Sequence, residues 1–354
     1  MKQKLFTLLL AVAASVGTMF AWDYENVQIG DLYYNLDATN QTAEVARNSS
    51  ASGDIIIPSS VTYNSVSYSV TSIGESAFDY CEGLTSIEIS NSVTSIGSFA
   101  FDSCSSLTSV TIPNTVTSIG DGACNGCSGL TGELVIPNSV ISIGSGAFSG
   151  CSGLTSIIVE NGNSFYDSRY NCNAIIETAT NTLIVGCMNT IIPNSVTSIG
   201  AWAFCGCNAL TSVTIEAETP PTLDSYAFDN TNNSPIYVPC GTLDAYKSAW
   251  SDYADRIKNE VEYTIIGNVN DAKAGSVDYP TSACGDVVIT AIPNYGYHFT
   301  QWSDGLKDNP RIAQITQDTT FTAEFAYDRV GTCGKDLALV WSYDPTNKVL
   351  TIGN

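Results

Sequence analysis

The sequence predicts a mainly β protein: a solenoid of parallel-strand coils with a helical C-terminal cap, followed by a small β-rich module. Three observations lead to this prediction. A motif of about 23 residues occurs five times, the same apolar positions recur in each copy, and after residue 261 the motif gives way to alternating strand patterns. A fixed period of this length is typical of stacked coils, because one coil cannot bury its apolar positions alone.

The first 21 residues are predicted to be a secretory signal peptide. Lys2 and Lys4 precede the apolar run "LFTLLLAVAASVGTMFA", and the chain turns polar after Ala21. No cysteine stands at this cleavage point, and no later apolar run is long enough to cross a bilayer. We therefore expect a secreted or cell-surface protein without a membrane span.

The charge balance restricts the partners. The formal net charge is −22, with 13 Lys and Arg against 35 Asp and Glu. Nucleic-acid binding relies on Lys and Arg to neutralise phosphates, so nucleic acid is not an expected partner.

Residues 22–69 are predicted to form an N-terminal β-hairpin cap. The segment "IGDLYYNLDATNQTAEV" has strand-like arms with Asn and Asp in the turn region. A cap of this kind would cover the open edge of the first coil.

Residues 70–239 are predicted to form the solenoid. Each coil is expected to have a short strand at "VTSIG", a tight bend at "ESAF" that could be one helical turn, and a clear strand such as "LTSVTI". Columns of Ile, Ala, Phe, Cys and Leu supply the core. The copies begin at Val70, Val93, Val116, Val140 and Val196. The cysteine column comprises Cys81, Cys104, Cys127, Cys151 and Cys207.

The outward positions of the "LTSVTI" strand form a candidate binding face. Val110 and Ile112 should face the core, so the residues between them should face outward. Most outward residues are small and polar, which predicts a wide, shallow contact; the alternative is that they are ordinary solvated strand residues. The face comprises Ser86, Glu88, Ser109, Thr111, Glu133, Val135, Ser156, Ile158, Ser212 and Thr214.

An insertion at about 161–190 interrupts the last interval between copies. In it "AIIET" and "TLIVG" flank "ATN", which predicts a β-hairpin. Cys172 and Cys187 lie outside the two arms. They either form a disulfide, which export permits, or are two buried thiols.

Phe165, Tyr166 and Tyr170 of the insertion are candidate contacts with a partner. Aromatic side chains supply much of the energy in many protein interfaces. The same residues could instead seal the hairpin onto the solenoid.

Residues 240–261 are predicted to be a capping helix. Five apolar residues follow helical spacing over 243–257, which predicts an amphipathic helix that covers the last coil. They are Leu243, Tyr246, Trp250, Tyr253 and Ile257.

The repeat "VTSIGxxAFxxCxxLTSVTIPNS", over about residues 24–260, resembles that of the BspA-like leucine-rich-repeat surface proteins of bacteria. The resemblance implies a leucine-rich-repeat type of solenoid in a secreted or surface-exposed protein. It also implies adhesion to host proteins and to other bacteria.

Residues 262–327 resemble the divergent internalin B-repeat modules of bacterial surface proteins, through "AIPNYGYHFTQWSDG" and "QDTTFTAEF". The resemblance implies a small β-rich spacer. Residues 328–354 look like the opening hairpin of a further, truncated BspA-like unit.

No catalytic, cofactor-binding or metal-binding residues are predicted. His298 is the one histidine, and it lies in a strand-like aromatic segment. The "CNGC" motif, Cys124 to Cys127, is explained by the Phe and Cys columns rather than by redox or zinc chemistry.

The leading hypothesis is a non-enzymatic binding protein that adheres to host proteins or other cells through its leucine-rich-repeat face. One alternative is a glycan-binding or glycan-degrading accessory protein, which a pocket with aromatic platforms and paired acids would favour. The other is a structural surface scaffold without a dedicated ligand.

Overall fold

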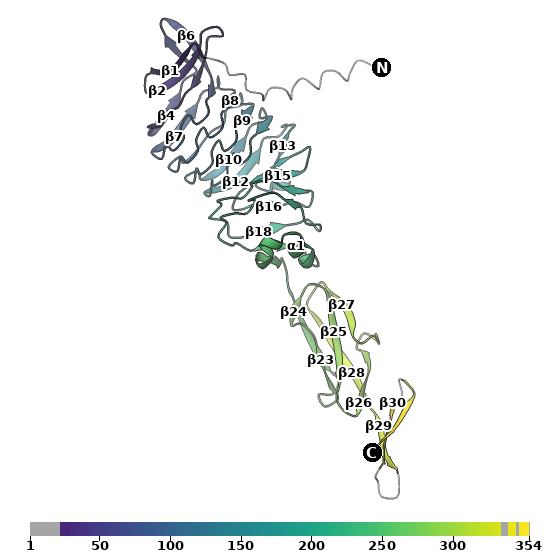
Figure 1. Cartoon of the computed structure of the whole chain (residues 1–354). Coiled ribbons are helices and arrows are strands. Elements are labelled where there is room, and N and C mark those ends of the chain that lie inside the picture. Colours follow the sequence, from purple (N-terminus) through teal and green to yellow (C-terminus); the bar gives the residue numbers. More distant parts are fainter. Residues whose placement is uncertain (1–21, 334–338, 345–346, 354) are drawn as a thin grey trace, which may run out of the picture. The chain divides into compact units, whose positions relative to one another are not determined.

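The computed structural model describes residues 22–333, 339–344 and 347–353, and Figure 1 traces the chain through its strands. The predicted signal peptide lies outside the described residues. Within them the chain forms two compact units. The first holds residues 22–191, 195–211 and 222–233, and the second holds 192–194, 212–221 and the residues from 234 onward.

The N-terminal cap is larger than the predicted hairpin. Strands β1 (Tyr24–Ile29), β2 (Leu32–Asp37) and β3 (Thr42–Val45) form an antiparallel meander. A hairpin of β5 (Ser60–Tyr63) and β6 (Val66–Ile73) follows, and β3 pairs with β6 in parallel. The meander therefore continues directly into the first coil and covers its edge.

The "VTSIG" segments form the most regular ladder of the coils. The short strands β8 (Ser95–Ile96), β9 (Ser118–Ile119) and β11 (Ser142–Ile143) continue from β6 in parallel. The isoleucine column pairs in register from coil to coil. The predicted short strand and its parallel direction are confirmed.

The "LTSVTI" strands are interrupted. Strand β4 (Gly53–Ile57) pairs in parallel with β7 (Leu84–Ile89), and β10 (Gly132–Ile136) pairs with β12 (Leu154–Val159). Between these pairs, residues 107–112 form only a single bridge, Ile87 to Val110. The prediction of a clear strand at residues 107–112 was wrong. The next coil carries an additional residue and a bulge at Gly132/Glu133, so β10 continues only toward β12.

The "ESAF" bends are successive turns rather than helical turns, and they form a hydrogen-bonded ladder of their own. The amide N–H of Phe78 donates to Ala100 O at 2.7 Å, and that of Phe101 donates to Ala123 O at 2.7 Å. The Phe78 and Phe101 rings stack at 5.5 Å between centroids. Each bend therefore satisfies its backbone through the next coil.

The cysteine column has a physical reason. Each thiol reaches a backbone carbonyl of the preceding coil: Cys104 Sγ donates to Phe78 O at 3.1 Å, and Cys127 Sγ donates to Phe101 O at 3.0 Å. Cys81 and Cys151 do the same at 3.0 and 3.2 Å. A small side chain with a weak donor thus fills the bend and satisfies a buried carbonyl.

The column thiols should not react in the folded protein. Cys104 is fully buried, and the neighbouring Cys127 thiol together with burial raises the pKa of Cys104. We expect an aromatic disulfide reagent at neutral pH to label Cys104 only after denaturation, because the thiolate is the reactive form. Mass spectrometry after timed labelling measures this, with the denatured chain as the reference for this buried thiol. Labelling of Cys104 as fast in the folded chain as in the denatured chain would contradict the assignment.

The insertion forms the predicted hairpin and adds a third strand. Strands β14 (Ala174–Glu177) and β15 (Thr182–Gly186) pair antiparallel, and β13 (Tyr166–Asp167) pairs with β14; a 3-10 turn, Arg169–Asn171, lies between them. Strand β15 pairs in parallel with β17 (Ser198–Ile199), which pairs with β19 (Thr222–Leu223). The hairpin thus occupies the place of one coil in this ladder.

The bends of the two coils that flank the insertion in sequence are hydrogen-bonded directly to each other. Gly150 N donates to Cys205 O at 2.8 Å, although the two residues are far apart in sequence. The coils are therefore in contact at their bends and held apart by β13–β15 at their "VTSIG" strands.

The capping segment is shorter as a helix than predicted. Helix α1 spans Leu243–Ala249, a 3-10 helix spans Ser251–Arg256, and Ile257 begins strand β21 (Ile257–Asn259). That strand extends the parallel sheet β16 (Ile191–Ile192), β18 (Val213–Ile215), β20 (Ile236–Val238) and β21. The segment therefore adds a further strand to the sheet as well as a cap. Trp250 cannot continue the helix, because its backbone ψ is 56°.

The β-rich module is formed by two sheets, in the orders β24-β22-β28-β26 and β23-β25-β27. Trp302, Ile289 and Ile315 lie in its core, fully buried. His298 makes a structural contact, with its Nδ1 2.6 Å from Asp328 Oδ1. The strands are β22 (Tyr263–Val269), β23 (Gly275–Asp278), β24 (Ser282–Ala283), β25 (Gly285–Pro293), β26 (Tyr297–Trp302), β27 (Arg311–Ile315) and β28 (Thr319–Tyr327).

The C-terminal segment forms a three-stranded antiparallel sheet where it is described. Its strands are β29 (Arg329–Cys333), β30 (Leu339–Asp344) and β31 (Val349–Gly353). The predicted hairpin falls within this sheet, and its assignment to a further repeat unit stays a prediction.

Candidate binding surface

The predicted strand face is outward, as the alternation indicated, but it is divided. None of its ten residues is buried. Because residues 107–112 do not form a strand, the face consists of short separate sheets rather than one surface. The exposed members are Glu88, Ser109, Thr111, Glu133, Val135 and Ile158. The half-buried members are Ser86, Ser156, Ser212 and Thr214. The last two lie in the second unit, with Thr214 in β18 and Ser212 directly before it.

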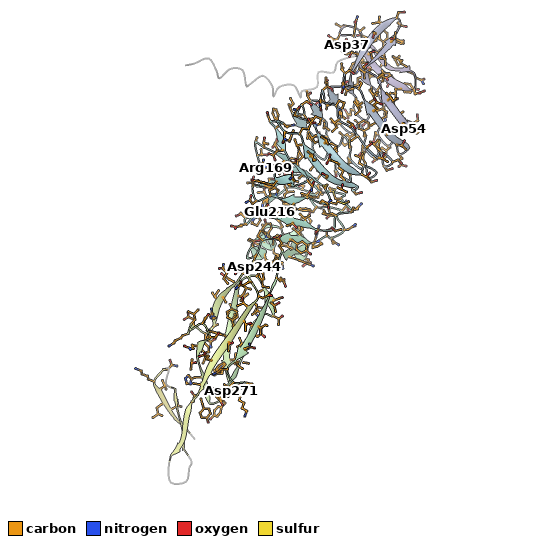
Figure 2. The ribbon with its side chains drawn as sticks, turned by 180° about the vertical axis from the view of Figure 1, so that it is seen from behind. Asp37, Asp54, Arg169, Glu216, Asp244 and Asp271 are labelled. Atoms are coloured by element: carbon orange, nitrogen blue, oxygen red, sulfur yellow. The ribbon has the colours of Figure 1, made fainter. Side chains whose placement is uncertain are left out.

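Local hydrogen bonds occupy part of this face. Ser86 Oγ and Thr85 Oγ1 donate to Asp54 Oδ1 at 2.7 and 2.9 Å, and these bonds lower the pKa of Asp54. Asp54 is exposed, as are the acidic residues Glu216, Asp244 and Asp271, which lie outside this face (Figure 2). The face therefore presents acidic and hydroxyl groups to solvent.

The insertion aromatics divide into two roles. Tyr166 is buried, and its hydroxyl accepts a hydrogen bond from Ile143 N at 2.9 Å, which attaches the insertion to the preceding coil. Phe165 and Tyr170 are instead 48% and 77% exposed. Only these two remain candidates for a contact with a partner.

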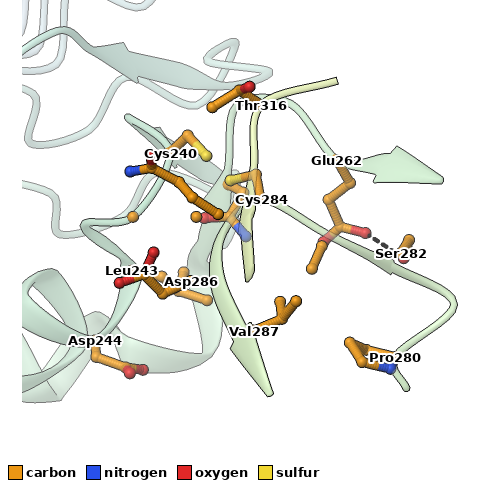
Figure 3. Close-up of a pocket in the computed structure, with 15 residues that line it drawn as sticks. Cys240, Leu243, Asp244, Glu262, Pro280, Ser282, Cys284, Asp286, Val287 and Thr316 are labelled. Atoms are coloured by element: carbon orange, nitrogen blue, oxygen red, sulfur yellow. Dashed lines mark hydrogen bonds between the residues drawn. The ribbon is translucent and has the colours of Figure 1, made fainter. Parts of the chain in front are cut away.

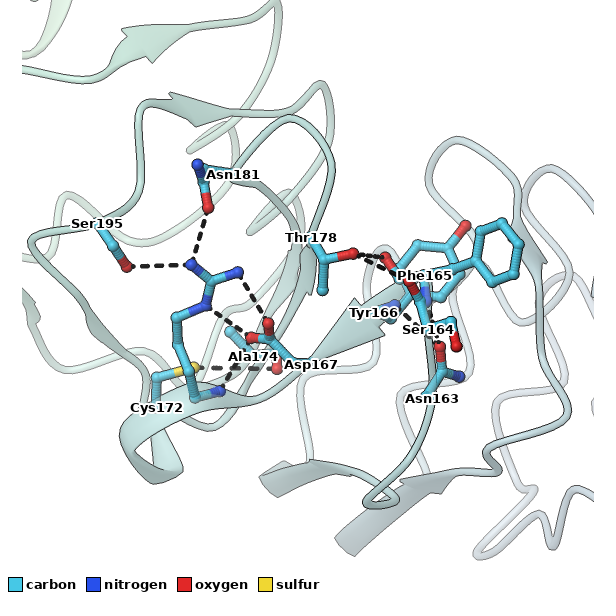
Figure 4. A network of polar contacts seen from close by, with 11 residues as sticks. Asn163, Ser164, Phe165, Tyr166, Asp167, Cys172, Ala174, Thr178, Asn181 and Ser195 are labelled. Atoms are coloured by element: carbon cyan, nitrogen blue, oxygen red, sulfur yellow. Dashed lines mark hydrogen bonds and ion pairs between the residues drawn. The ribbon is translucent and has the colours of Figure 1, made fainter. Parts of the chain in front are cut away.

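Arg169 holds the insertion in place, and Figure 4 labels its partners Asp167, Asn181 and Ser195. Its guanidinium donates to both oxygens of Asp167 at 2.8 Å, to Asn181 Oδ1 at 2.8 Å and to Ser195 Oγ at 3.3 Å. The bonds to Asp167 raise the pKa of Arg169. A planar, bidentate donor of this kind joins the hairpin turn to the next coil.

Cys172 and Cys187 are both buried free thiols in the structure. Cys187 Sγ donates to Asn173 O at 3.4 Å, and Cys172 Sγ lies 4.0 Å from Ala174 O. The register of the hairpin, with Ala174 opposite Gly186, places Cys187 opposite Asn173 rather than opposite Cys172. A bond between them would need this register to change. The register therefore favours two buried thiols, and the disulfide stays a prediction.

A groove that sequence reasoning missed lies along the bends of the first unit. We name it the aromatic groove: a hollow of about 250 Å³ with aromatic walls and glycines between them. The Phe99 ring covers Gly122, where a Cβ would lie 2.5 Å from Phe99 Cε1, and Trp202 stands beside Gly146. The lining residues are Phe99, Gly122, Asn125, Ser145, Gly146, Ser149 and Trp202.

The walls of the aromatic groove are backbone outliers. Phe99 and Trp202 have φ of 56° and 65°, a left-handed region that bulky residues rarely adopt. The equivalent positions in the coils between them are Gly122 and Gly146, which adopt it without strain. Bulky residues kept at strained positions are characteristic of functional sites. The signal was visible in the sequence, because Phe99, Trp202 and Tyr226 are aromatic in a column that otherwise holds Gly or Ser.

The groove combines apolar rings with a few polar groups. Phe99 and Trp202 are 43% and 41% exposed, and Trp202 lies 4.7 Å from Tyr226 between ring centroids. Asn125 Nδ2 donates to Asp102 Oδ1 at 2.6 Å, which fixes the amide at the groove. No carboxylate lines the groove. The arrangement is suited to binding an apolar side chain or a flat ring.

Two kinds of feature are absent from the described part of the chain. Among those residues, no three or more His, Cys, Asp or Glu side chains are grouped so that they could hold a metal ion. No helix there has the length and apolar character needed to span a membrane.

Comparisons with known proteins match two family models. The BspA type leucine-rich-repeat region matches in six copies over residues 54–177 and 185–268. The divergent InlB B-repeat domain matches residues 265–329. No curated protein matches the chain.

Several solved structures are similar. A leucine-rich-repeat protein from Bacteroides capillosus is 29% identical, over 39% of this chain and 100% of its own, with a TM-score of 0.34. One from Bacteroides ovatus is 22% identical, over 70% and 59%, with a TM-score of 0.39. A leucine-rich cell surface protein from Faecalibacterium prausnitzii is 20% identical, over 66% and 93%, with a TM-score of 0.28.

Proposed function

We propose a function from one premise: the chain belongs to the BspA type leucine-rich-repeat family. That membership, together with the divergent InlB B-repeat module, confirms the predicted family and fold class, and it fits a non-enzymatic binding role at a surface. Our proposal is that the protein is exported and adheres to proteins of a host or of other cells. Its contact residues would be exposed side chains of the coils and of the insertion.

The aromatic groove is the observation that carries this proposal. A concave apolar site between rigid coils can accept an anchoring side chain of a partner, and such anchors dominate many interfaces. None of the ten residues of the strand face lines this hollow, and the face consists of short sheets. We therefore assign the groove as the principal contact and the strand face as its periphery.

Glycine substitutions test the groove directly. Phe99→Gly with Trp202→Gly should abolish adhesion to an immobilised extracellular-matrix preparation. The same variant should change the free energy of unfolding by no more than about 1 kcal/mol, because glycine relieves the left-handed backbone while the rings are lost. Binding by biolayer interferometry and a thermal melt measure the two effects.

Tyr80→Gly is the matched control, because Tyr80 is also exposed and left-handed, at 65% and 57°, but does not line the groove. It should retain adhesion. If the double variant unfolds easily while its folded fraction still adheres, the rings are structural and the proposal is wrong.

The insertion provides a second, separable test. Phe165→Ser with Tyr170→Ser should leave the melt unchanged, because both side chains are exposed, and should weaken adhesion if the insertion contributes contacts. Tyr166→Ser should lower the melting temperature, because it removes a buried ring and its bond to Ile143 N. Unchanged adhesion in the first variant would exclude the insertion from the interface.

A glycan ligand is the second candidate function, favoured by the two aromatic walls, since sugar rings pack against such rings. The absence of lining carboxylates favours binding over hydrolysis there. Treating the matrix preparation separately with protease and with glycosidases distinguishes the candidates: adhesion lost only after glycosidase treatment would identify a glycan. If every variant adheres as well as the wild type, a structural scaffold is favoured.

A further inference from the structure

Two cysteines stand outside the repeat columns and lie together in the second unit. Cys240 follows strand β20, and Cys284 lies between β24 and β25. Both line one pocket, where their side chains point toward each other (Figure 3). Neither residue has a role in the leucine-rich-repeat core, so their proximity requires another explanation.

The backbones approach closely at this point. A Cβ placed on Gly285 would lie 3.0 Å from Gly241 Cα and 3.3 Å from Gly241 N. Cys240 Sγ lies 3.9 Å from Ile315 O, and Ile315 is the strand partner of Gly285. Each cysteine directly precedes one of the touching glycines, so the two main chains are as near as a disulfide requires.

The thiols themselves are in contact. Partial burial, with a hydrogen bond to the Cys284 thiol, raises the pKa of Cys240. Neighbouring column thiols also touch, as Cys104 and Cys127 do, but those are buried and each donates to a carbonyl. Cys240 is exposed and Cys284 half-buried, so an oxidant can reach this pair.

We propose that Cys240 and Cys284 form a disulfide in the exported protein. The two thiols lose two protons and two electrons as the S–S bond forms. The electrons pass to an oxidised dithiol oxidoreductase of the export compartment, whose own disulfide becomes two thiols through a mixed-disulfide intermediate. The bond would close a loop that contains α1, β21, β22 and β23, and so would fix the cap segment to the β-rich module.

Two proteases make the bond detectable. Trypsin cleaves between the two cysteines, at Lys247, Arg256, Lys258 and Lys273. Chymotrypsin cleaves after Tyr237 and Leu243, which separates Cys240 from the other cysteines of its tryptic peptide, residues 170–247. The full mature chain, secreted from cells, is alkylated without reduction, denatured and digested. We expect a linked pair of Cys240 and Cys284 peptides, lighter by two hydrogen atoms than the separate peptides. The column cysteines and Cys172 should carry the alkyl group.

Two variants make the outcome decisive. Cys240→Ser should leave Cys284 open to a maleimide reagent in the folded protein, whereas Cys172→Ser should leave the linked pair intact. A reductant should lower the melting temperature of the wild-type second unit and leave that of Cys240→Ser unchanged. Recovery of Cys240 and Cys284 as separate alkylated peptides, or linkage of either one to another cysteine, would overturn the proposal.

Discussion

Leu107→Asp is expected to abolish the stable fold of the solenoid. Leu107 has no exposed surface, and it belongs to a leucine column whose neighbours Leu84 and Leu130 are also buried. A carboxylate there would have no partner on either side and would cost several kcal/mol, on top of roughly 2–5 kcal/mol for the lost side chain. A domain stable by about 5–15 kcal/mol cannot absorb that loss without populating unfolded states.

The damage should spread beyond one coil, because each coil is stabilised mainly by its neighbours. Urea titration followed by circular dichroism measures it, and hydrogen exchange resolves which coils open. Ser109→Asp is the matched control: it lies two residues away but is exposed, so it should change the free energy of unfolding by less than about 0.5 kcal/mol. Equal midpoints for the two variants would mean that the columns are misassigned.

Sequence reasoning succeeded where one physical requirement repeats. The isoleucine, alanine and cysteine columns recur because every coil must bury the same positions. The in-register pairs from Ile73 to Ile143 confirm the isoleucine column, and the alanine and cysteine columns are buried. The insertion hairpin was predictable for a different, local reason, since two apolar arms flank a polar turn.

The errors lie where a single copy departs from the repeat. Residues 107–112 have the same pattern as other strands, yet a one-residue difference in the next coil leaves them with one bridge. The helix beyond Ala249 was overestimated because apolar spacing alone does not distinguish a helix from a turn followed by a strand. The aromatic groove was missed because Phe99 and Trp202 come from coils that are distant in sequence, and the insertion hides their proximity.

Removal of the cap segment, residues 243–259, is expected to produce an associating protein. Tyr246 and Trp250 are buried, and they donate to Ala217 O at 2.7 Å and to Pro221 O at 2.9 Å. Without them, the apolar residues of β18 and β20 would be exposed, and β20 would become an open strand edge. Exposed edges of this kind pair with other chains.

The experiment replaces 243–259 by a flexible Gly/Ser linker and measures mass by light scattering after gel filtration. We expect oligomers that grow with concentration, and a lower melting temperature. Tyr246→Ala should reproduce the loss of stability, at about 3–5 kcal/mol for a large buried aromatic, while leaving β21 in place to protect the edge. Asp244→Ala, at an exposed position of the same helix, should change neither property. A deletion variant that stays monomeric and melts with the wild type would show that β20 needs no cover, because capping repeats are required only where the last coil would otherwise expose its core.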